Sequence, residues 1–331
     1  MKRTGFTVFM AMILLAGTTV WAEGQKEAAA SDDWGVRDIV IGAGGAGGSW
    51  YLLGAQISEM MGKEFPNISF SSVEGGAVTN VRHVNKGVDM DIGMAALPDV
   101  TDGLANTGPF KGEGINNVAP IINFATDYVQ LTVLANSPIR KLSDIQDKRL
   151  LPGPRNWGIE FIMRDLLSLF NLDYDGVQKK GGSVSFVSWG EAPSLLTDGH
   201  ADLAAFKGAY PLSNIMEIAA TNPVRIVPLS ADEMKRFMER RNGFFPGSIP
   251  AGTYRGQTED TPTIGHTSVI FARKDLSEDF VYAFTKLLVE NAKALSTVQG
   301  IDLAKAPLNG INPELLHPGA RRYYKEIGMV K

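Results

Sequence analysis

The chain reads Asp38-Ile39-Val40-Ile41-Gly42-Ala43-Gly44-Gly45-Ala46-Gly47-Gly48-Ser49-Trp50-Tyr51 near its start. Here a short apolar strand runs into five glycines and then into a stretch that is compatible with a helix. Gly42, Gly44 and Gly47 spell G-x-G-x-x-G, the fingerprint of dinucleotide-binding loops. Taken alone, this fingerprint predicts an oxidoreductase. The main functional question is whether these glycines hold a pyrophosphate or a small solute.

The first 22 residues have the pattern of a secretory signal peptide. Lys2 and Arg3 precede an apolar run over 6–15, and Val20-Trp21-Ala22 offers a small-residue cleavage site. We expect cleavage after Ala22 and a periplasmic protein that folds where dinucleotides are scarce. An N-terminal membrane anchor is the alternative, and it is disfavoured because the apolar run is too short to span a bilayer comfortably.

The composition argues against several classes of site and partner. The 331 residues include no cysteine, which rules out disulfides, thiolate metal sites and lipid attachment through an N-terminal cysteine. The formal net charge of −4 gives no reason to expect nucleic acid or an anionic membrane as a partner. We therefore expect the mature protein to be soluble and monomeric, with no later membrane span.

After the signal peptide, the sequence divides into a polar leader and a long region in which short apolar strands alternate with helical segments. The leader is expected over 23–35, and the rest is long enough for two α/β lobes. The first lobe is expected over 36–123, the second over 124–229, and the chain returns to the first lobe over 230–331.

Two crossover segments are expected to form a hinge between the lobes. Extended apolar stretches over 118–124 and 128–135 suggest the passage out of the first lobe, and Val224–Leu229 suggests the return. Two α/β lobes joined in this way can close around a small ligand in a central cleft.

A strand, glycine loop and helix occur in this order once in each half. The second loop is Gly153-Pro154-Arg155-Asn156-Trp157-Gly158. Each loop would bring free backbone N–H groups and a helix N-terminus to one point, which favours an anion. The alternative is that both are ordinary turns that use glycine for its backbone freedom.

Several aromatic residues and one arginine stand beside these glycine turns. Trp50, Tyr51, Trp157, Trp189 and Tyr210 either line the cleft or pack in the core, and the sequence leaves both possibilities open. Arg155, next to a helix start, is well placed to pair with a ligand carboxylate.

Few motifs in the sequence indicate an enzyme. A dinucleotide site needs an acidic residue about 20 residues after the glycines, and Glu74 lies further on, before another glycine pair. The four histidines show no metal-binding spacing, and no nucleophile elbow or P-loop occurs. We expect no catalytic residue, no metal and no cofactor.

Several motifs, taken in order, resemble a known family. Gly44–Gly54 is similar to a glycine-rich start with paired aromatics, and Glu74–Arg82 to a G-G-S-x-x-N segment. Asp198–Asp202, Ile249–Gln257 and Leu316–Tyr324 are similar to later motifs of the same set. Together they resemble the TAXI class of solute-binding proteins, which serve tripartite ATP-independent periplasmic (TRAP) transporters.

This resemblance implies a type II periplasmic-binding-protein-like fold, no enzymatic activity, and a TRAP membrane permease as partner. It also implies a small carboxylate ligand of the glutamate or 2-oxoglutarate class. The residues expected to bind the ligand come from both lobes and the hinge side: Gly47, Gly48, Ser49, Trp50, Tyr51, Gly76, Thr79, Asn80, Arg155, Asn156, Trp157, Gly158, Tyr210 and Tyr254.

The chain departs from the family pattern in the second glycine loop. Where the family has small hydroxyl residues, this sequence has Asn156 and Trp157. The indole either narrows the cleft or offers a stacking wall for a different organic acid. Two alternatives to transport stay open from the sequence: an exported flavin- or nicotinamide-dependent oxidoreductase, and a ligand-binding sensor.

Overall fold

The computed structural model describes residues 34–304 and 307–331. The expected signal peptide, its cleavage site and most of the leader lie outside these residues. No helix in the described part is long and apolar enough to cross a membrane.

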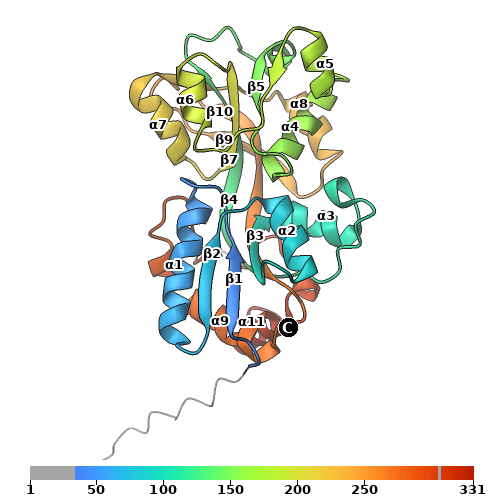
Figure 1. Ribbon diagram of the computed structural model, residues 1–331, viewed down its shortest axis with the longest axis vertical. Helices are drawn as coiled ribbons and strands as arrows, with labels where there is room; N and C mark the ends of the chain where they lie inside the picture. Colours follow the sequence, from blue (N-terminus) through green and yellow to red (C-terminus); the bar gives the residue numbers. More distant parts are fainter. Residues whose placement is uncertain (1–33, 305–306) are drawn as a thin grey trace, which may run out of the picture. The chain divides into compact units, whose positions relative to one another are not determined.

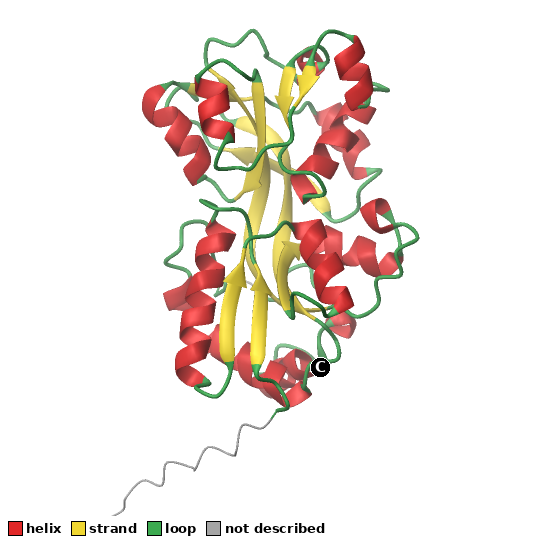
Figure 2. Ribbon diagram, in the orientation of Figure 1, coloured by secondary structure: helices red, strands yellow, loops and turns green. Residues whose placement is uncertain are grey.

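One mixed sheet with helices on its two faces forms the framework (Figures 1 and 2). The strand order is β2-β1-β3-β10-β4-β7-β5-β6, with β8 on β4 and β9 on β10. The strands are β1 (Asp38–Gly42), β2 (Ser69–Val73), β3 (Ile92–Ala96), β4 (Ala119–Leu134), β5 (Arg149–Leu151), β6 (Ser183–Val184), β7 (Leu203–Gly208), β8 (Val224–Ile226), β9 (Phe244–Ile249) and β10 (Thr261–Ala272).

The helices follow the strands in the order that parallel crossover connections require. They are α1 (Ser49–Glu64), α2 (Ala77–Lys86), α3 (Leu97–Ala105), α4 (Gly158–Ser168), α5 (Tyr174–Lys179), α6 (Ala192–Thr197), α7 (Ser213–Thr221), α8 (Ala231–Met238), α9 (Glu278–Glu290), α10 (Ala292–Leu295) and α11 (Pro318–Glu326). Local sequence explains several ends: Ser230 and Glu233 form a capping box at α8, Ser277 caps α9, and α2 stops at Gly87, where φ is 62°.

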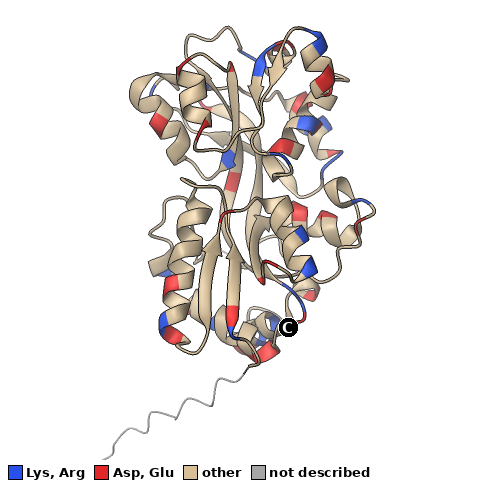
Figure 3. Ribbon diagram, viewed as in Figure 1, with Lys and Arg blue, Asp and Glu red and all other residues tan. Residues whose placement is uncertain are grey.

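The buried side chains form two separate hydrophobic clusters. The first contains Ile39, Ile57 and Phe280 and is built on β1–β3 with α1, α2 and α9. The second contains Leu166 and Phe206 and is built on β5 and β7 with α4. Charged residues of both signs are interspersed along the helices and loops (Figure 3).

Two long strands run through both clusters. Residues 118–125 and 269–272 pack in the first cluster, whereas Val129, Val133 and Ile264 pack in the second. β4 and β10 pair antiparallel, and their register shifts between Ser268 and Val269, where the strands pass from one cluster to the other. The predicted α/β fold with two lobes and two connecting segments is confirmed.

The second connection differs from the one expected at Val224–Leu229. That run instead begins with β8, which pairs with β4 beside the second cluster. Met234, Phe237 and Tyr254, beyond it, also pack in the second cluster. The second connection is instead β10. The sequence did not reveal this, because a short apolar run has the same pattern whether it crosses between the lobes or lies at the edge of one lobe.

Candidate ligand-binding site

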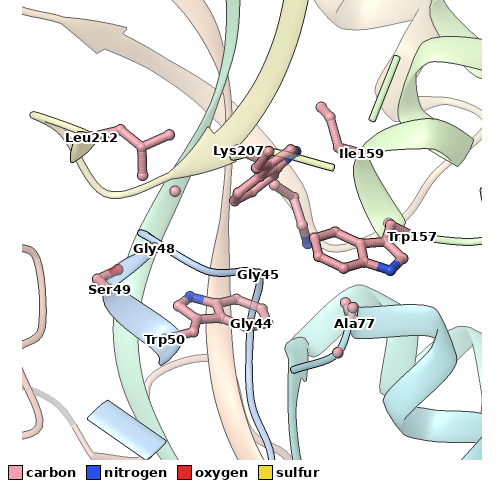
Figure 4. A pocket seen from close by; sticks show the side chains of 15 residues that line it. Gly44, Gly45, Gly48, Ser49, Trp50, Ala77, Trp157, Ile159, Lys207 and Leu212 are labelled. Carbon is pink, nitrogen blue, oxygen red and sulfur yellow. The ribbon is translucent and has the colours of Figure 1, made fainter. Parts of the chain in front are cut away.

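A narrow pocket lies where α1, α2, α4 and β7 meet, and it is lined by both clusters (Figure 4). The cavity within it measures about 30 Å³. Its lining consists mostly of glycine and apolar side chains: Gly44, Gly45, Gly48, Ser49, Trp50, Gly75, Gly76, Ala77, Trp157, Gly158, Ile159, Trp189, Lys207, Gly208 and Leu212.

Three helices begin at this pocket. Their N-cap residues are Gly48 for α1, Gly76 for α2 and Trp157 for α4, and none of the three has a side-chain cap. The first N–H groups of a helix have no partner inside the helix, and they carry the positive end of the helix dipole. The pocket thus gathers the backbone groups that suit an anion.

Lys207 brings a positive charge to the same place from β7. Its side chain is 7% exposed, and its Nζ has no hydrogen-bond partner. Nζ lies 4.0 Å from Asp99 Oδ2 and 5.2 Å from the centre of the Trp50 ring. Burial lowers the pKa of Lys207, and the nearby carboxylates of Asp99 and Asp127 act in the opposite direction.

Trp50 is held in place by the connecting strands. Its Nε1 donates to Asp127 Oδ2 at 2.9 Å, and Ser268 Oγ donates to the same oxygen at 2.6 Å. Burial raises the pKa of Asp127, which is fully enclosed between β4 and β10. The indole N–H of Trp50 is therefore already used, and its ring serves as a wall.

Trp157 enters the pocket from the α4 side and fills a slot between two glycines (Figure 4). A Cβ at Gly45 would lie 2.6 Å from the end of the Trp157 ring, and a Cβ at Gly76 would overlap Trp157 Cγ. The ring also meets Trp189 edge-on at 5.7 Å. Of the two roles foreseen for this indole, the structure displays the narrowing of the cleft.

Some of the residues expected to bind the ligand do line the pocket. They are Gly48, Ser49, Trp50, Gly76, Trp157 and Gly158. Asn156 and Thr79 lie next to them: Asn156 has a left-handed backbone with φ of 66°, and Thr79 Oγ1 donates to its carbonyl at 3.3 Å. This bond ties α2 to the loop that carries Trp157.

Other expected residues lie away from the pocket. Gly47 has a φ of 80° and faces Asn214, and Tyr51 is 39% exposed. The guanidinium of Arg155 stacks 3.7 Å above Phe186, in a separate surface hollow.

Asn80, Tyr210 and Tyr254 have structural contacts instead. Asn80 is buried, and its Nδ2 donates to three backbone carbonyls, those of Gly42, Ala43 and Met94. The Tyr210 ring packs against Tyr128 at 5.1 Å. Tyr254 donates its hydroxyl to Gln130 Oε1 and accepts from the Leu212 N–H at 2.8 Å, and burial raises its pKa.

A buried ionic cluster stands behind Lys207. Arg241 lies 3.0 Å from Asp99, 3.2 Å from Asp102 and 3.0 Å from Asp165. Asp99 and Asp102 belong to α3 and Asp165 to α4, so the guanidinium links helices of the two clusters. Burial raises the pKa of both Asp102 and Asp165.

The sequence reasoning missed Lys207, Ile159 and Leu212, whereas Trp189, one of the aromatic residues for which both roles were open, does line the pocket. The available signal for Lys207 was a single lysine inside Leu203–Gly208, a strand that is otherwise apolar. No group of three His, Asp or Glu side chains that could hold a metal ion occurs in the part of the chain that the structure describes.

Solved structures that match this chain include an alkanesulfonate-binding protein from Xanthomonas axonopodis pv. citri, at 15% identity and a TM-score of 0.44 over 81% of each chain. A putative L-cystine ABC transporter protein from Listeria monocytogenes is 13% identical, with a TM-score of 0.48 over 82% of this chain and 98% of that one. A putative phosphate ABC transporter substrate-binding protein from Clostridium perfringens is 13% identical, with a TM-score of 0.47 over 81% of this chain and 100% of that one.

At these sequence identities and TM-scores, the similarity to these structures carries no information on the ligand. The match to a family is of a different kind, because it concerns the sequence along nearly the whole described region. The NMT1-like family matches residues 41–328. Since this match extends over more than half of its length, the chain belongs to the NMT1-like family.

Proposed function

We propose that this chain is the extracytoplasmic solute-binding subunit of a TRAP-type transporter. It captures a small organic anion, a carboxylate, between its two lobes and delivers it to the membrane permease. The observation that carries the proposal is Lys207, a buried ammonium without a hydrogen-bond partner, placed at a pocket where three uncapped helices begin.

The energetics of such a site suit capture and release. A hydrogen bond to a charged group contributes about 1.5–3 kcal/mol. A few of these bonds, from Lys207 and the helix starts, account for an affinity in the micromolar range, about −8 kcal/mol. The pocket is lined from both clusters, so a bound anion stabilises the closed arrangement over an open one.

The TRAP class of permease and the periplasmic location rest on sequence features. These are the basic and apolar start of the chain and the motifs between Gly44 and Tyr324 that resemble the TAXI class. The carboxylates associated with that resemblance are glutamate and 2-oxoglutarate, and both are ligands to be tested. A sensor with the same pocket would bind the same ligands without a permease.

The alternative oxidoreductase receives less support from the geometry. The slot between Gly45 and Gly76, where the glycine fingerprint would place a pyrophosphate, is filled by the Trp157 ring. Glu74, the nearest candidate for a ribose, accepts the Ala46 N–H at 3.3 Å. The non-enzymatic reading therefore remains our proposal.

The test is a titration of the purified mature protein with a panel of carboxylates and with NAD and FMN. Trp50, Trp157 and Trp189 line the pocket and provide a fluorescence signal, and calorimetry gives the affinity. We expect Lys207→Met to weaken carboxylate binding about 10- to 100-fold, because it removes one charge-assisted hydrogen bond. Lys63→Met is the matched control, since Lys63 is 71% exposed and pairs with Glu59 at the surface.

Tight binding of a dinucleotide, together with no binding of any carboxylate, would contradict the proposal. The transporter class has its own test, which is uptake of the identified ligand into vesicles that contain the cognate permease. We expect uptake to follow an ion gradient, and a strict requirement for ATP would contradict the TRAP assignment.

A further inference from the structure

The lining of the pocket carries a single ionisable side chain, that of Lys207. Two carboxylates face Lys207, and both have other partners: Asp99 pairs with Arg241 at 3.0 Å, and Asp127 accepts hydrogen bonds from Trp50 and Ser268. The remaining side chains offer one hydroxyl, from Ser49, the indole N–H groups of Trp157 and Trp189, and apolar surface. A ligand can therefore place one charged group at Lys207, and a second charged group would find no ionised side chain of opposite sign in the lining.

The room beyond Lys207 is short and apolar. The cavity of about 30 Å³ is bounded by the indoles of Trp50, Trp157 and Trp189. Trp50 is fixed by its bond to Asp127, and Trp189 by its edge contacts with Trp157 and Phe206. The engineered cavity that binds benzene measures about 150 Å³. The pocket must therefore widen to take up any organic anion, and a short anion requires the least widening.

Trp157 sets this limit. Its ring occupies the slot between Gly45 and Gly76, which would otherwise add to the volume of the pocket. Glycine at both positions lets the backbone approach the ring faces closely, so the indole is seated as a fixed part of the wall.

We propose that the pocket selects a monocarboxylate with a short apolar body, and that Trp157 determines the maximum length. The carboxylate pairs with Lys207 and the helix starts, and the hydrocarbon part lies against Trp50 and Trp189. This inference rests on the proposed function, and it narrows that function to one subclass of organic anion.

Dicarboxylates and amino acids fit less well for an electrostatic reason. A buried charge without a partner costs several kcal/mol. 2-Oxoglutarate would bring a second carboxylate, and glutamate would add an ammonium as well. We therefore expect both to bind at least about 100-fold more weakly than the best monocarboxylate.

The experiment is calorimetry of the full mature chain, stripped of carried ligand, with acetate, propionate, butyrate, benzoate, succinate, 2-oxoglutarate and glutamate. We expect the tightest binding for acetate and propionate, and weaker binding by about 10-fold or more for butyrate and benzoate. A dicarboxylate or glutamate that binds more tightly than every monocarboxylate would overturn this inference and leave the proposed function standing. Binding of none of these acids would overturn both.

The role of Trp157 has a separate readout. Trp157→Ala should extend the range, so that butyrate and benzoate gain affinity relative to acetate by about 10-fold. Trp157→Phe, which keeps an aromatic ring in the slot, should keep most of the wild-type preference. If Trp157→Ala, folded as judged by circular dichroism, retains the wild-type order of affinities, Trp157 does not set the length limit.

Discussion

At the scale of single residues, Gly76 shows how one hydrogen atom in place of a methyl group shapes the pocket. Its backbone, at φ −138° and ψ 150°, is extended and open to any residue, so the need for glycine comes only from contact with Trp157. We expect Gly76→Ala to weaken carboxylate binding by about 10-fold or more, because an overpacked contact costs about 1–3 kcal/mol. Calorimetry measures this loss.

Gly62→Ala is the matched control for Gly76→Ala. An added Cβ at Gly62, near the end of α1, would meet no atom within 4 Å. Alanine there should leave binding unchanged and raise stability by about 0.5–1 kcal/mol. The double variant Gly76→Ala with Trp157→Ala should recover affinity, and a failure to recover it would mean that the methyl group acts elsewhere.

Lys207 also predicts how binding depends on pH. Burial lowers the pKa of Lys207, and the groups that face it are Asp99, Asp127, Arg241 and His266. Only the charged ammonium attracts a carboxylate, so affinity should fall as the pH rises through the lowered pKa, and binding should take up a proton in that range. Calorimetry in buffers of different ionisation enthalpy measures the uptake, and Lys207→Met should abolish it.

At the scale of elements, Arg241 ties α3 to α4. Arg241→Met leaves the buried carboxylates of Asp99 and Asp102, and the partly exposed one of Asp165, without their guanidinium partner, and we expect a loss of about 3–5 kcal/mol in the free energy of unfolding. Arg322→Met is the control: Arg322 also pairs with two carboxylates, Glu278 and Asp279, but is 43% exposed, so about 0–1 kcal/mol is expected. Urea unfolding compares the two.

The dependence of unfolding free energy on pH gives a second test of the cluster around Arg241. The pKa values of Asp102 and Asp165 are raised by burial, so the folded state binds more protons than the unfolded state between the ordinary and the raised values. Their contribution to stability is therefore larger at low pH and is lost as the pH rises. Without Arg241 this trend should steepen, and equal losses for the two arginine variants at every pH would contradict the role of the cluster.

At the scale of the whole described chain, two clusters joined by β4 and β10 share one pocket. Ligand should therefore slow hydrogen exchange at the starts of α1 and α4 together, while α9 and α11, in the first cluster and away from the pocket lining, change little. Exchange measured by mass spectrometry follows these segments separately. Protection on one side alone would show that the ligand does not bridge the clusters.

The first glycine loop predicted a strand, a turn and a helix start correctly, because those depend on local backbone preferences. Lys207 could not be placed, since its position beside Trp50 depends on strand pairing between residues far apart. The second connection between the lobes was wrongly predicted at Val224–Leu229 for the same reason. It is formed by β10, which pairs with β3 and β4, and the local sequence of these strands does not reveal that pairing.

The contact of Trp157 with Gly45 and Gly76 has a consequence for sequence variation among relatives. A large ring at one position is compatible only with the smallest residue at the other two, although more than 80 residues separate each glycine from the ring. Relatives with a small side chain in place of Trp157 are then free to carry alanine or serine at the glycine positions. Positions 45, 76 and 157 should covary, and the side chains that a relative carries there should indicate the size of its ligand.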